Sequence, residues 1–397
     1  MDELDALWAF LVAALIAFAV TPPVARLARR LGVIHRPRDR DLHDRPVPGL
    51  GGLAILAAVV VSALLFLPAN GETRGIIGGA LAIAFVGAVD DYREAGLHPA
   101  VKLAGQFAAA AIPVSAGVFV DHLTLPFLDP IALSDTAGRA LTLVGMVAVM
   151  NVVNFTDGAD GLAAGVCTIA AGTFAIIALS FPGREDAAIL AALTAGASVG
   201  FLWHNFHPAS IFMGDAGSNL LGLLLACVAI QGILKTAAVV ALFFPLLILA
   251  VPALDATFVV AKRIKYRRPV YSADRWHFHH RFANIGFSQR RTVLYLYGWT
   301  LSLAALALAM RFVPYSDDDG TLNPGWALVI AAFGLVAVAS SIYLVVVLEI
   351  LKFRRSRERE IQRQVETGEM PALSAEEIRR EVDREAETGE FEAVRTD

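Results

Sequence analysis

Charged side chains are scarce in this chain: Asp, Glu, Lys and Arg make up 18% of its 397 residues, whereas hydrophobic residues make up 56%. No soluble core of this size needs so many apolar residues, so the composition indicates a polytopic membrane protein. Cysteine is rarer still, because the chain has only Cys167 and Cys227, both inside apolar segments. These two residues predict neither a disulfide nor a metal site.

Two nucleotide-binding signatures are also missing. The chain has no G-x-x-x-x-G-K-[ST] sequence and no glycine fingerprint of the dinucleotide-binding type. An ordinary nucleotide-hydrolysing fold is therefore excluded.

Apolar stretches long enough to cross a bilayer recur along the whole chain. We expect about eleven membrane-spanning helices and an all-α fold. The expected spans are Leu7–Ala25, Gly51–Pro68, Gly75–Val89, Val101–Val120, Ala140–Phe155, Leu162–Phe181, Ala187–Trp203, Leu220–Leu234, Ala237–Ala261, Val293–Phe312 and Trp326–Leu351.

The distribution of charge predicts the orientation. The first residues, Met1–Asp5, are acidic where a secretory signal would be basic, so the first span is expected to be an anchor with the N-terminus outside. Basic residues concentrate in alternate loops, at 26–45, at 262–291 and from Lys352 onward. This bias places the C-terminus in the cytoplasm. We expect a transmembrane domain over residues 1–352 and a charged, solvated, partly helical or disordered cytoplasmic tail over residues 353–397.

The stretch Asn151–Gly161, N-V-V-N-F-T-D-G-A-D-G, interrupts two apolar runs with two carboxylates, two carboxamides and a hydroxyl. One Asp at the centre of a membrane helix costs roughly 3 kcal/mol, so such a cluster normally lines a site or a water-filled cavity. The alternative is a short interfacial loop whose Asp and Asn side chains cap helices.

Acidic and basic side chains also stand at the ends of other spans. Asp90 and Asp91 repel each other, and adjacent carboxylates of this kind build acid/base pairs and Mg²⁺ sites. Lys102 either faces a phosphate or extends to the membrane interface. Asp215, between glycines at the start of a span, is either an N-terminal cap or part of a site.

Two loops carry histidine with other cations. The first contains His43 and Arg45 in a segment made rigid by proline and permissive by glycine, which suits an anion that must be approached closely. The second contains His277, His279 and His280, which suggest metal or phosphate contact. Phosphate is favoured because zinc usually takes tighter ligand geometry and often thiolates.

All of these groups fall on the cytoplasmic side when the expected spans alternate in direction, whereas capping residues would be spread over both sides. Acidic positions beside basic loops fit a cytoplasmic site for a polyphosphate ligand with a divalent ion. An ion-coupled transporter is the alternative from another class, but its carboxylates would lie near the midplane and its two halves would show matching interrupted segments. The sequence shows neither feature.

Five motifs resemble the signature set of the polyprenyl-phosphate N-acetylhexosamine-1-phosphate transferases. They are H-D-R-P-V-P-G-L-G-G, D-D, N-V-V-N-F-T-D-G-A-D-G-L-A-A-G, F-M-G-D-A-G-S and H-F-H-H-R, which occur in the family's order up to about Phe282. Within the family, the chain is most similar to bacterial undecaprenyl-phosphate N-acetylglucosamine-1-phosphate transferases. One departure is Ala159, where the family usually has Leu, which leaves both flanking carboxylates in place.

The resemblance implies a reaction and its partners. Family members transfer a sugar phosphate from a UDP-sugar to a lipid phosphate and release UMP, with Mg²⁺, for which Mn²⁺ is an alternative. UDP-N-acetylglucosamine, undecaprenyl phosphate and membrane lipids are the expected partners, in a bacterial plasma membrane with a cytoplasmic active site. A homodimer is compatible with the family, and no nucleic acid is expected. The rival member transfers phospho-N-acetylmuramoyl-pentapeptide, and its loop usually reads H-H-H-F-E instead of the H-F-H-H-R of His277–Arg281.

The resemblance also implies residue roles. Asp215 and Asp91 are expected to ligate the metal, and Asp90 or Asp91 to handle the lipid phosphate or its proton, so that the lipid phosphate attacks the β-phosphorus directly. Nucleotide-sugar contacts are implied for Asn154, Asp157, Gly158, Asp160, Asn205 and Phe212, of which Phe212 would stack on uracil. Phosphate or substrate contacts are implied for His43, Arg45, Lys102, His277, His279, His280 and Arg281.

Overall fold

The computed structural model describes most of the chain. The described residues are 3–35, 46–93, 95–123, 131–234, 248–265, 287–314, 323–343, 353–366, 374, 376–378 and 380–382. The expected contacts of His43, Arg45, His277, His279, His280 and Arg281 lie outside these residues and stay predictions.

The described elements are helices with two short strand pairs. The first half contains α1 (Glu3–Arg30), β1 (Ile34–His35), β2 (Val47–Pro48), α2 (Gly52–Phe66), α3 (Gly71–Tyr92), α4 (Pro99–Ser115), β3 (His122–Leu123), β4 (Ile131–Ala132) and α5 (Asp135–Thr156). The second half contains α6 (Leu162–Leu179), α7 (Glu185–Asn205), α8 (Gly214–Ala229), the π-helical turn η1 (Ile230–Leu234), α10 (Ala250–Lys265), α12 (Gln289–Phe312), α13 (Pro324–Ile342) and α14 (Phe353–Glu366).

Long apolar helices confirm an all-α, polytopic membrane protein. Among the described residues, eight helices are long and apolar enough to cross a membrane, and α2 is a shorter apolar helix. The expected span at 237–261 lies partly outside the described residues, which contain its end as α10. The count of about eleven spans and the orientation of the chain stay predictions.

Helix α8 is the centre of the bundle. It contacts α2, α3, α5, α6 and α7, and its side chains from Leu220 to Leu225 are buried. Its N-terminal turn lies against α3, because a Cβ on Gly87 would come within 2.4 Å of the Cα of Ala216. Small residues at such crossings let helix backbones approach closely, as is common in membrane proteins. This packing fixes the start of α8 beside the end of α3.

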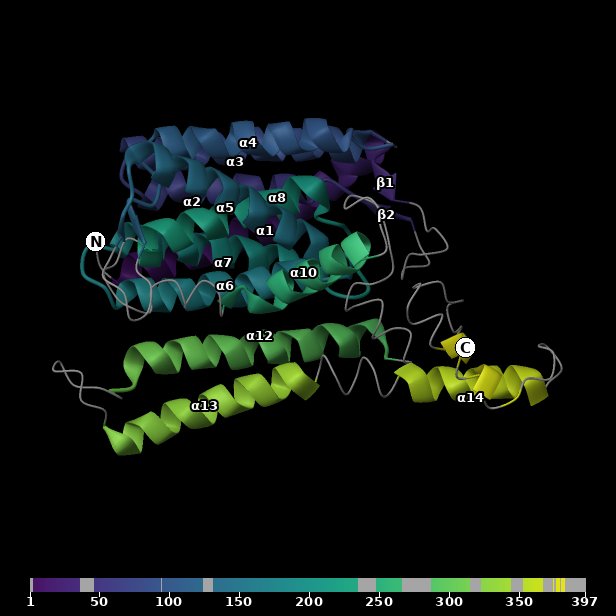
Figure 1. Ribbon diagram of the computed structural model, residues 1–397. Coiled ribbons are helices and arrows are strands. Elements are labelled where there is room, and N and C mark those ends of the chain that lie inside the picture. Colours follow the sequence, from purple (N-terminus) through teal and green to yellow (C-terminus); the bar gives the residue numbers. More distant parts are fainter. Residues whose placement is uncertain are drawn as a thin grey trace.

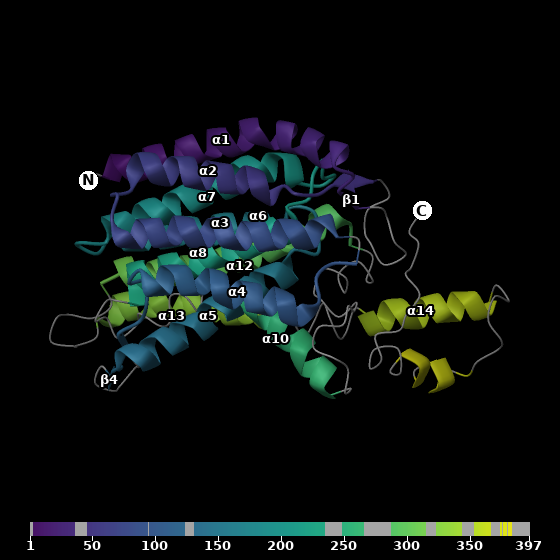
Figure 2. The same ribbon diagram turned by 90° about the horizontal axis from the view of Figure 1, so that it is seen from above.

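The functional end of the bundle is marked by the β1–β2 pair (Figure 1). Helices α3, α5 and α7 end there, and α4 and α8 begin there (Figures 1 and 2). Phe212, just before α8, donates its backbone N–H to the carbonyl of Pro48 in β2 at 2.9 Å. The antiparallel β3–β4 pair lies at the opposite end (Figure 2).

Cys167 and Cys227 are free and buried, as expected of residues that form no disulfide. The tail contains the helix α14, and Ile361 of this helix packs against Ile378 and Val382. The domain boundary near residue 352 stays a prediction.

Candidate active site

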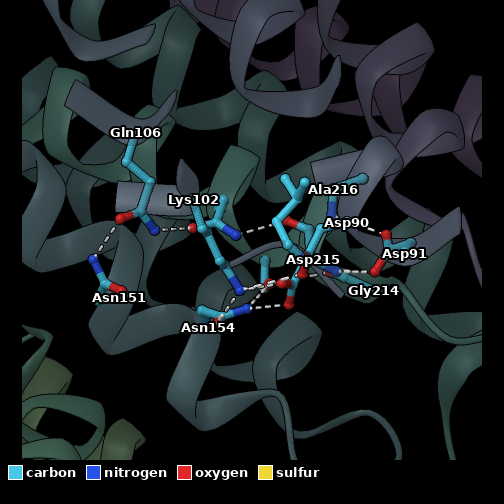
Figure 3. Close-up of polar contacts among 12 residues, drawn as sticks. Asp90, Asp91, Lys102, Gln106, Asn151, Asn154, Gly214, Asp215 and Ala216 are labelled. Carbon is cyan, nitrogen blue, oxygen red and sulfur yellow. Dashed lines mark hydrogen bonds and ion pairs between the residues drawn. The ribbon is translucent and has the colours of Figure 1, made fainter. Parts of the chain in front are cut away.

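Three helices bring a lysine, an asparagine and an aspartate together at the functional end. Lys102 comes from the first turn of α4, Asn154 from the last turn of α5 and Asp215 from the first turn of α8 (Figure 3). The ammonium of Lys102 contacts Oδ2 of Asp215 and lies 3.5 Å from Oδ1 of Asn154. Asn154 donates from Nδ2 to Oδ1 of Asp215 at 2.6 Å. We call these three residues the reactive layer.

The two adjacent aspartates of α3 have different partners. Asp90 points toward α4, where its Oδ2 lies 3.6 Å from the Lys102 ammonium and its Oδ1 accepts the backbone N–H of Leu97. Asp91 points toward α8 and accepts the backbone N–H groups of Asp215 at 2.8 Å and Ala216 at 3.1 Å. Asp90 therefore contacts the reactive layer through Lys102, and Asp91 contacts it through the backbone of Asp215.

Asp91 is the cap of α8. Helix N-termini leave unsatisfied N–H groups, and a carboxylate there also benefits from the helix dipole. Met213 at the N-cap position offers no side-chain hydrogen bond to the first turn, so α3 supplies the acceptor. The alternative that Asp215 itself is the N-terminal cap is wrong, because Asp215 lies inside the first turn and its carboxylate faces Lys102 and Asn154.

Asp157 follows the last residue of α5 and is partly buried. Burial raises the pKa of its carboxyl well above the usual value, and the carboxylates of Asp215 and Asp91 raise it further. Within the described part of the chain, no hydrogen bond to this carboxylate is present. Asp157 is therefore an acidic group at the end of α5 whose carboxyl is open to a cation or a ligand.

Asp160 and Asn205 hold the turn after α5 against the loop that precedes α8. The buried carboxylate of Asp160 accepts from Nδ1 of His207 at 2.8 Å and from the backbone N–H of Ala209 at 3.1 Å. Asn205 accepts the backbone N–H of Gly161 at 3.1 Å and donates to the carbonyl of Ile211 at 2.9 Å. These residues shape the loop, and their predicted contact with the nucleotide stays a prediction.

Two further predicted residues lie in the same region. Gly158 is exposed in the turn between α5 and α6. The ring of Phe212 lies edge-on to His35, with ring centroids 5.7 Å apart. The predicted stacking of Phe212 on uracil stays a prediction.

Sequence reasoning missed a set of polar side chains beneath the reactive layer. Gln106 and Asn219 are buried and share a hydrogen bond of 2.7 Å, and Ser218 accepts from Asn154 at 2.9 Å. Their spacing was a usable signal, because Gln106 lies four residues after Lys102 and Asn219 four after Asp215. Residues four apart share one face of a helix.

The donor atoms of the site fit Mg²⁺. Across the described ranges, no group of three His, Cys, Asp or Glu side chains could hold a metal ion by itself. The carboxylate of Asp215 nevertheless supplies hard oxygen ligands of the kind that Mg²⁺ prefers. This ion usually takes one or two carboxylates and completes its sphere with water and substrate phosphates.

Comparison with known proteins gives one family and several relatives. The model of the family described as glycosyl transferase family 4 matches residues 73–233, a range that includes both Asp90 and Asp215. A probable undecaprenyl-phosphate N-acetylglucosaminyl 1-phosphate transferase of Bacillus subtilis is 37% identical over 307 residues, which are 76% of this chain and 84% of the relative. A decaprenyl-phosphate N-acetylglucosaminephosphotransferase of Mycobacterium leprae is 38% identical over 356 residues, 82% of this chain and 88% of the relative. A phospho-N-acetylmuramoyl-pentapeptide-transferase of Desulforudis audaxviator is 36% identical over 336 residues, 75% of this chain and 97% of the relative.

Proposed function

The chain belongs to glycosyl transferase family 4, and from that premise we propose that it transfers N-acetylglucosamine-1-phosphate from UDP-N-acetylglucosamine to a polyprenyl phosphate and releases UMP. The observation that carries this proposal is the convergence of Lys102, Asn154 and Asp215 at one end of a membrane helix bundle. A lipid-anchored phosphate and a water-soluble nucleotide can meet only at such an end.

Charge determines what the site must supply. Two phosphates with about two negative charges each, about 5 Å apart at an effective dielectric constant near 20, repel by roughly 3 kcal/mol per charge pair, or about 13 kcal/mol in all. The Lys102 ammonium, which is held at the site between Asp215 and Asp90, would offset part of this repulsion by its positive charge. A single ammonium cannot offset all of it, which supports a requirement for a divalent cation.

We assign the cation to Asp215, with Asp157 as a second donor. Mg²⁺ bound there would neutralise phosphate charge and stabilise the charge that develops on departing UMP. Asp91 accepts the backbone N–H groups of Asp215 and Ala216, so its main role in this proposal is to hold the first turn of α8, and with it Asp215, in place. Its predicted role as a direct ligand stays a prediction.

In the proposed reaction an oxygen of the polyprenyl phosphate attacks the β-phosphorus of the donor. The bond between that phosphorus and the bridging oxygen breaks, and UMP leaves with the electron pair. Asp90 is the proposed acceptor for the proton of the polyprenyl phosphate, because it lies beside Lys102, the residue proposed to bind that phosphate. Lys102 then orients the phosphate while Asn154 keeps the Asp215 carboxylate in position.

We also propose that the functional end faces the cytoplasm of a bacterial cell. Arg29 and Arg30 end α1 at this end. Arg290, in the first turn of α12, donates to the backbone carbonyl of His207, which belongs to the same region. A concentration of basic residues marks the cytoplasmic side of membrane proteins.

The experiment is a transfer assay with purified protein in detergent. UDP-N-acetylglucosamine labelled in the sugar is incubated with undecaprenyl phosphate and Mg²⁺, and both lipid-linked label and free UMP are measured. We expect equal amounts of the two products and loss of both after chelation. UDP-N-acetylmuramoyl-pentapeptide in a parallel reaction should give little product. A site that hydrogen-bonds a specific substrate group strongly rejects analogues that lack that group. Faster transfer from the pentapeptide donor would contradict the proposed substrate.

A further inference from the structure

A chain of three carboxamide side chains lies next to the reactive layer, and Figure 3 labels two of its members, Gln106 and Asn151. Asn151 donates from Nδ2 to Oε1 of Gln106 at 2.9 Å, and Gln106 donates from Nε2 to Oδ1 of Asn219 at 2.7 Å. Asn219 in turn donates from Nδ2 to the backbone carbonyl of Asp215 at 2.8 Å. We call Asn151, Gln106 and Asn219 the carboxamide chain.

Each member of the carboxamide chain lies one helical turn below a member of the reactive layer. On α4, Gln106 follows Lys102 by four residues, and on α8, Asn219 follows Asp215 by four. On α5, which runs the other way, Asn151 precedes Asn154 by three. Because α4 and α8 begin at the functional end and α5 ends there, all three carboxamides lie deeper in the bundle (Figure 1).

The hydrogen bonds of the carboxamide chain connect α5 to α4 and α4 to α8. Gln106 uses both ends of its carboxamide, one toward α5 and one toward α8, so it fixes both neighbours of α4. Gln106 and Asn219 are each 1% exposed, so water cannot replace a lost partner. Alternative helix positions would leave buried polar groups without partners, which is unfavourable in a low-dielectric interior.

We propose that the carboxamide chain is a positioning network that sets the separation of the reactive-layer side chains for the transfer step. This inference rests on the proposed function for its kinetic readout. Lys102 and Asp215 belong to different helices, and their contact requires α4 and α8 to keep one register. A mutation far from the reacting atoms can lower the rate about 100-fold if it displaces the reacting groups by about 1 Å. The carboxamide chain touches the reactive layer from below, so its loss should affect turnover more than donor binding.

The first test is Gln106→Met, which removes the hydrogen-bonding groups but keeps an unbranched side chain of similar length. In the transfer assay we expect kcat to fall about tenfold to 100-fold while KM for UDP-N-acetylglucosamine stays at the wild-type value. The matched control is Thr142→Val. Thr142, on α5, is buried like Gln106, and its hydroxyl accepts the backbone N–H of Val120 at 3.0 Å. It lies about 18 Å along α5 from Asn154. We expect Thr142→Val to leave kcat unchanged.

The second test is rescue by exchange. Gln106→Asn shortens the α4 side by one methylene, and Asn219→Gln lengthens the α8 side by one. Each single variant should lower kcat, and the double variant should recover more activity than the two separate effects predict. The exchange restores the reach between α4 and α8 but neither the original packing nor the hydrogen bond to Asn151, so we expect partial recovery, whereas a role in packing alone would give none.

The outcomes separate this inference from the proposed function. Wild-type kcat in Gln106→Met, an equal loss in Thr142→Val, or no recovery in the double variant would overturn the positioning network. If the wild-type protein transfers no sugar phosphate, the proposed function fails instead. Hydrogen exchange of the backbone amides of residues 214–219 then decides the inference: faster exchange in Gln106→Met than in Thr142→Val supports it, and equal exchange overturns it.

Discussion

The carboxylate of Asp91 accepts the backbone N–H of Asp215 at 2.8 Å, so an acidic residue at the end of α3 holds the acidic residue that faces the reactive lysine. Asp91→Asn replaces one of the two acceptor oxygens with an amide group, so one of the two hydrogen bonds to the first turn of α8 should be lost. A typical hydrogen bond contributes about 1 kcal/mol to folding stability. We predict that Asp91→Asn lowers both the melting temperature and kcat.

Asp90→Asn is the companion variant. Asp90 lies beside Lys102 and caps no helix N-terminus, so the substitution should lower kcat by orders of magnitude with a smaller change in melting temperature. Turnover and thermal unfolding are measured on the same preparations. A loss of lipid-phosphate affinity alone, at unchanged kcat in both variants, would show that the aspartate pair only binds substrate.

Gly214→Ala should disturb the same contact from the other side. Gly214 has a φ of 69°, and a Cβ there would come within 2.4 Å of Oδ2 of Asp91. The left-handed conformation alone costs an L-residue roughly 1–2 kcal/mol. We expect lower thermal stability and reduced turnover. Gly145→Ala on α5 is the matched control, because nothing lies within 4 Å of its Cβ position, and it should leave both quantities intact or raise stability slightly.

The positions of the helices were largely predictable from the sequence. Apolar runs of membrane-spanning length lie on α1, α5, α6, α7, α12 and α13, because helices in a bilayer must be apolar and must satisfy their backbone hydrogen bonds internally. The clustering of the acidic residues at one end was predictable as well, since alternating spans bring every second loop to the same side.

The contacts between helices were not predictable in the same way. Asp91 and Ala216 are 125 positions apart in the chain, and their hydrogen bond depends on how closely α3 and α8 approach. That approach is set by small residues such as Gly87, whose effect depends on which helix lies opposite. Periodicity identifies a face of a helix but not its neighbour. The sequence therefore left open whether Asp215 capped α8 or lined the site.

Asp160→Asn tests whether the loop before α8 contributes to donor binding. The substitution keeps the shape of the side chain but places an amide where a carboxylate now accepts from His207 and Ala209. At least one of these hydrogen bonds should weaken, and the loop should become less ordered. We predict that KM for UDP-N-acetylglucosamine rises more than kcat falls. The opposite split, a lower kcat at an unchanged KM, would place Asp160 among the residues that act in the transfer step.

Lys102→Met separates the role of the lysine from that of the cation. The ammonium contacts Asp215 and lies 3.6 Å from Asp90, so it repels any divalent ion that approaches the same carboxylates. Removal of this charge should therefore strengthen Mn²⁺ binding, measured by electron paramagnetic resonance of the free ion, while turnover falls to background because the phosphates lose their cationic partner. Asp215→Asn is the reciprocal variant and should abolish both Mn²⁺ binding and turnover in a folded protein. Weaker Mn²⁺ binding in Lys102→Met would contradict this, because it would mean that the lysine organises the cation site and does not compete with it.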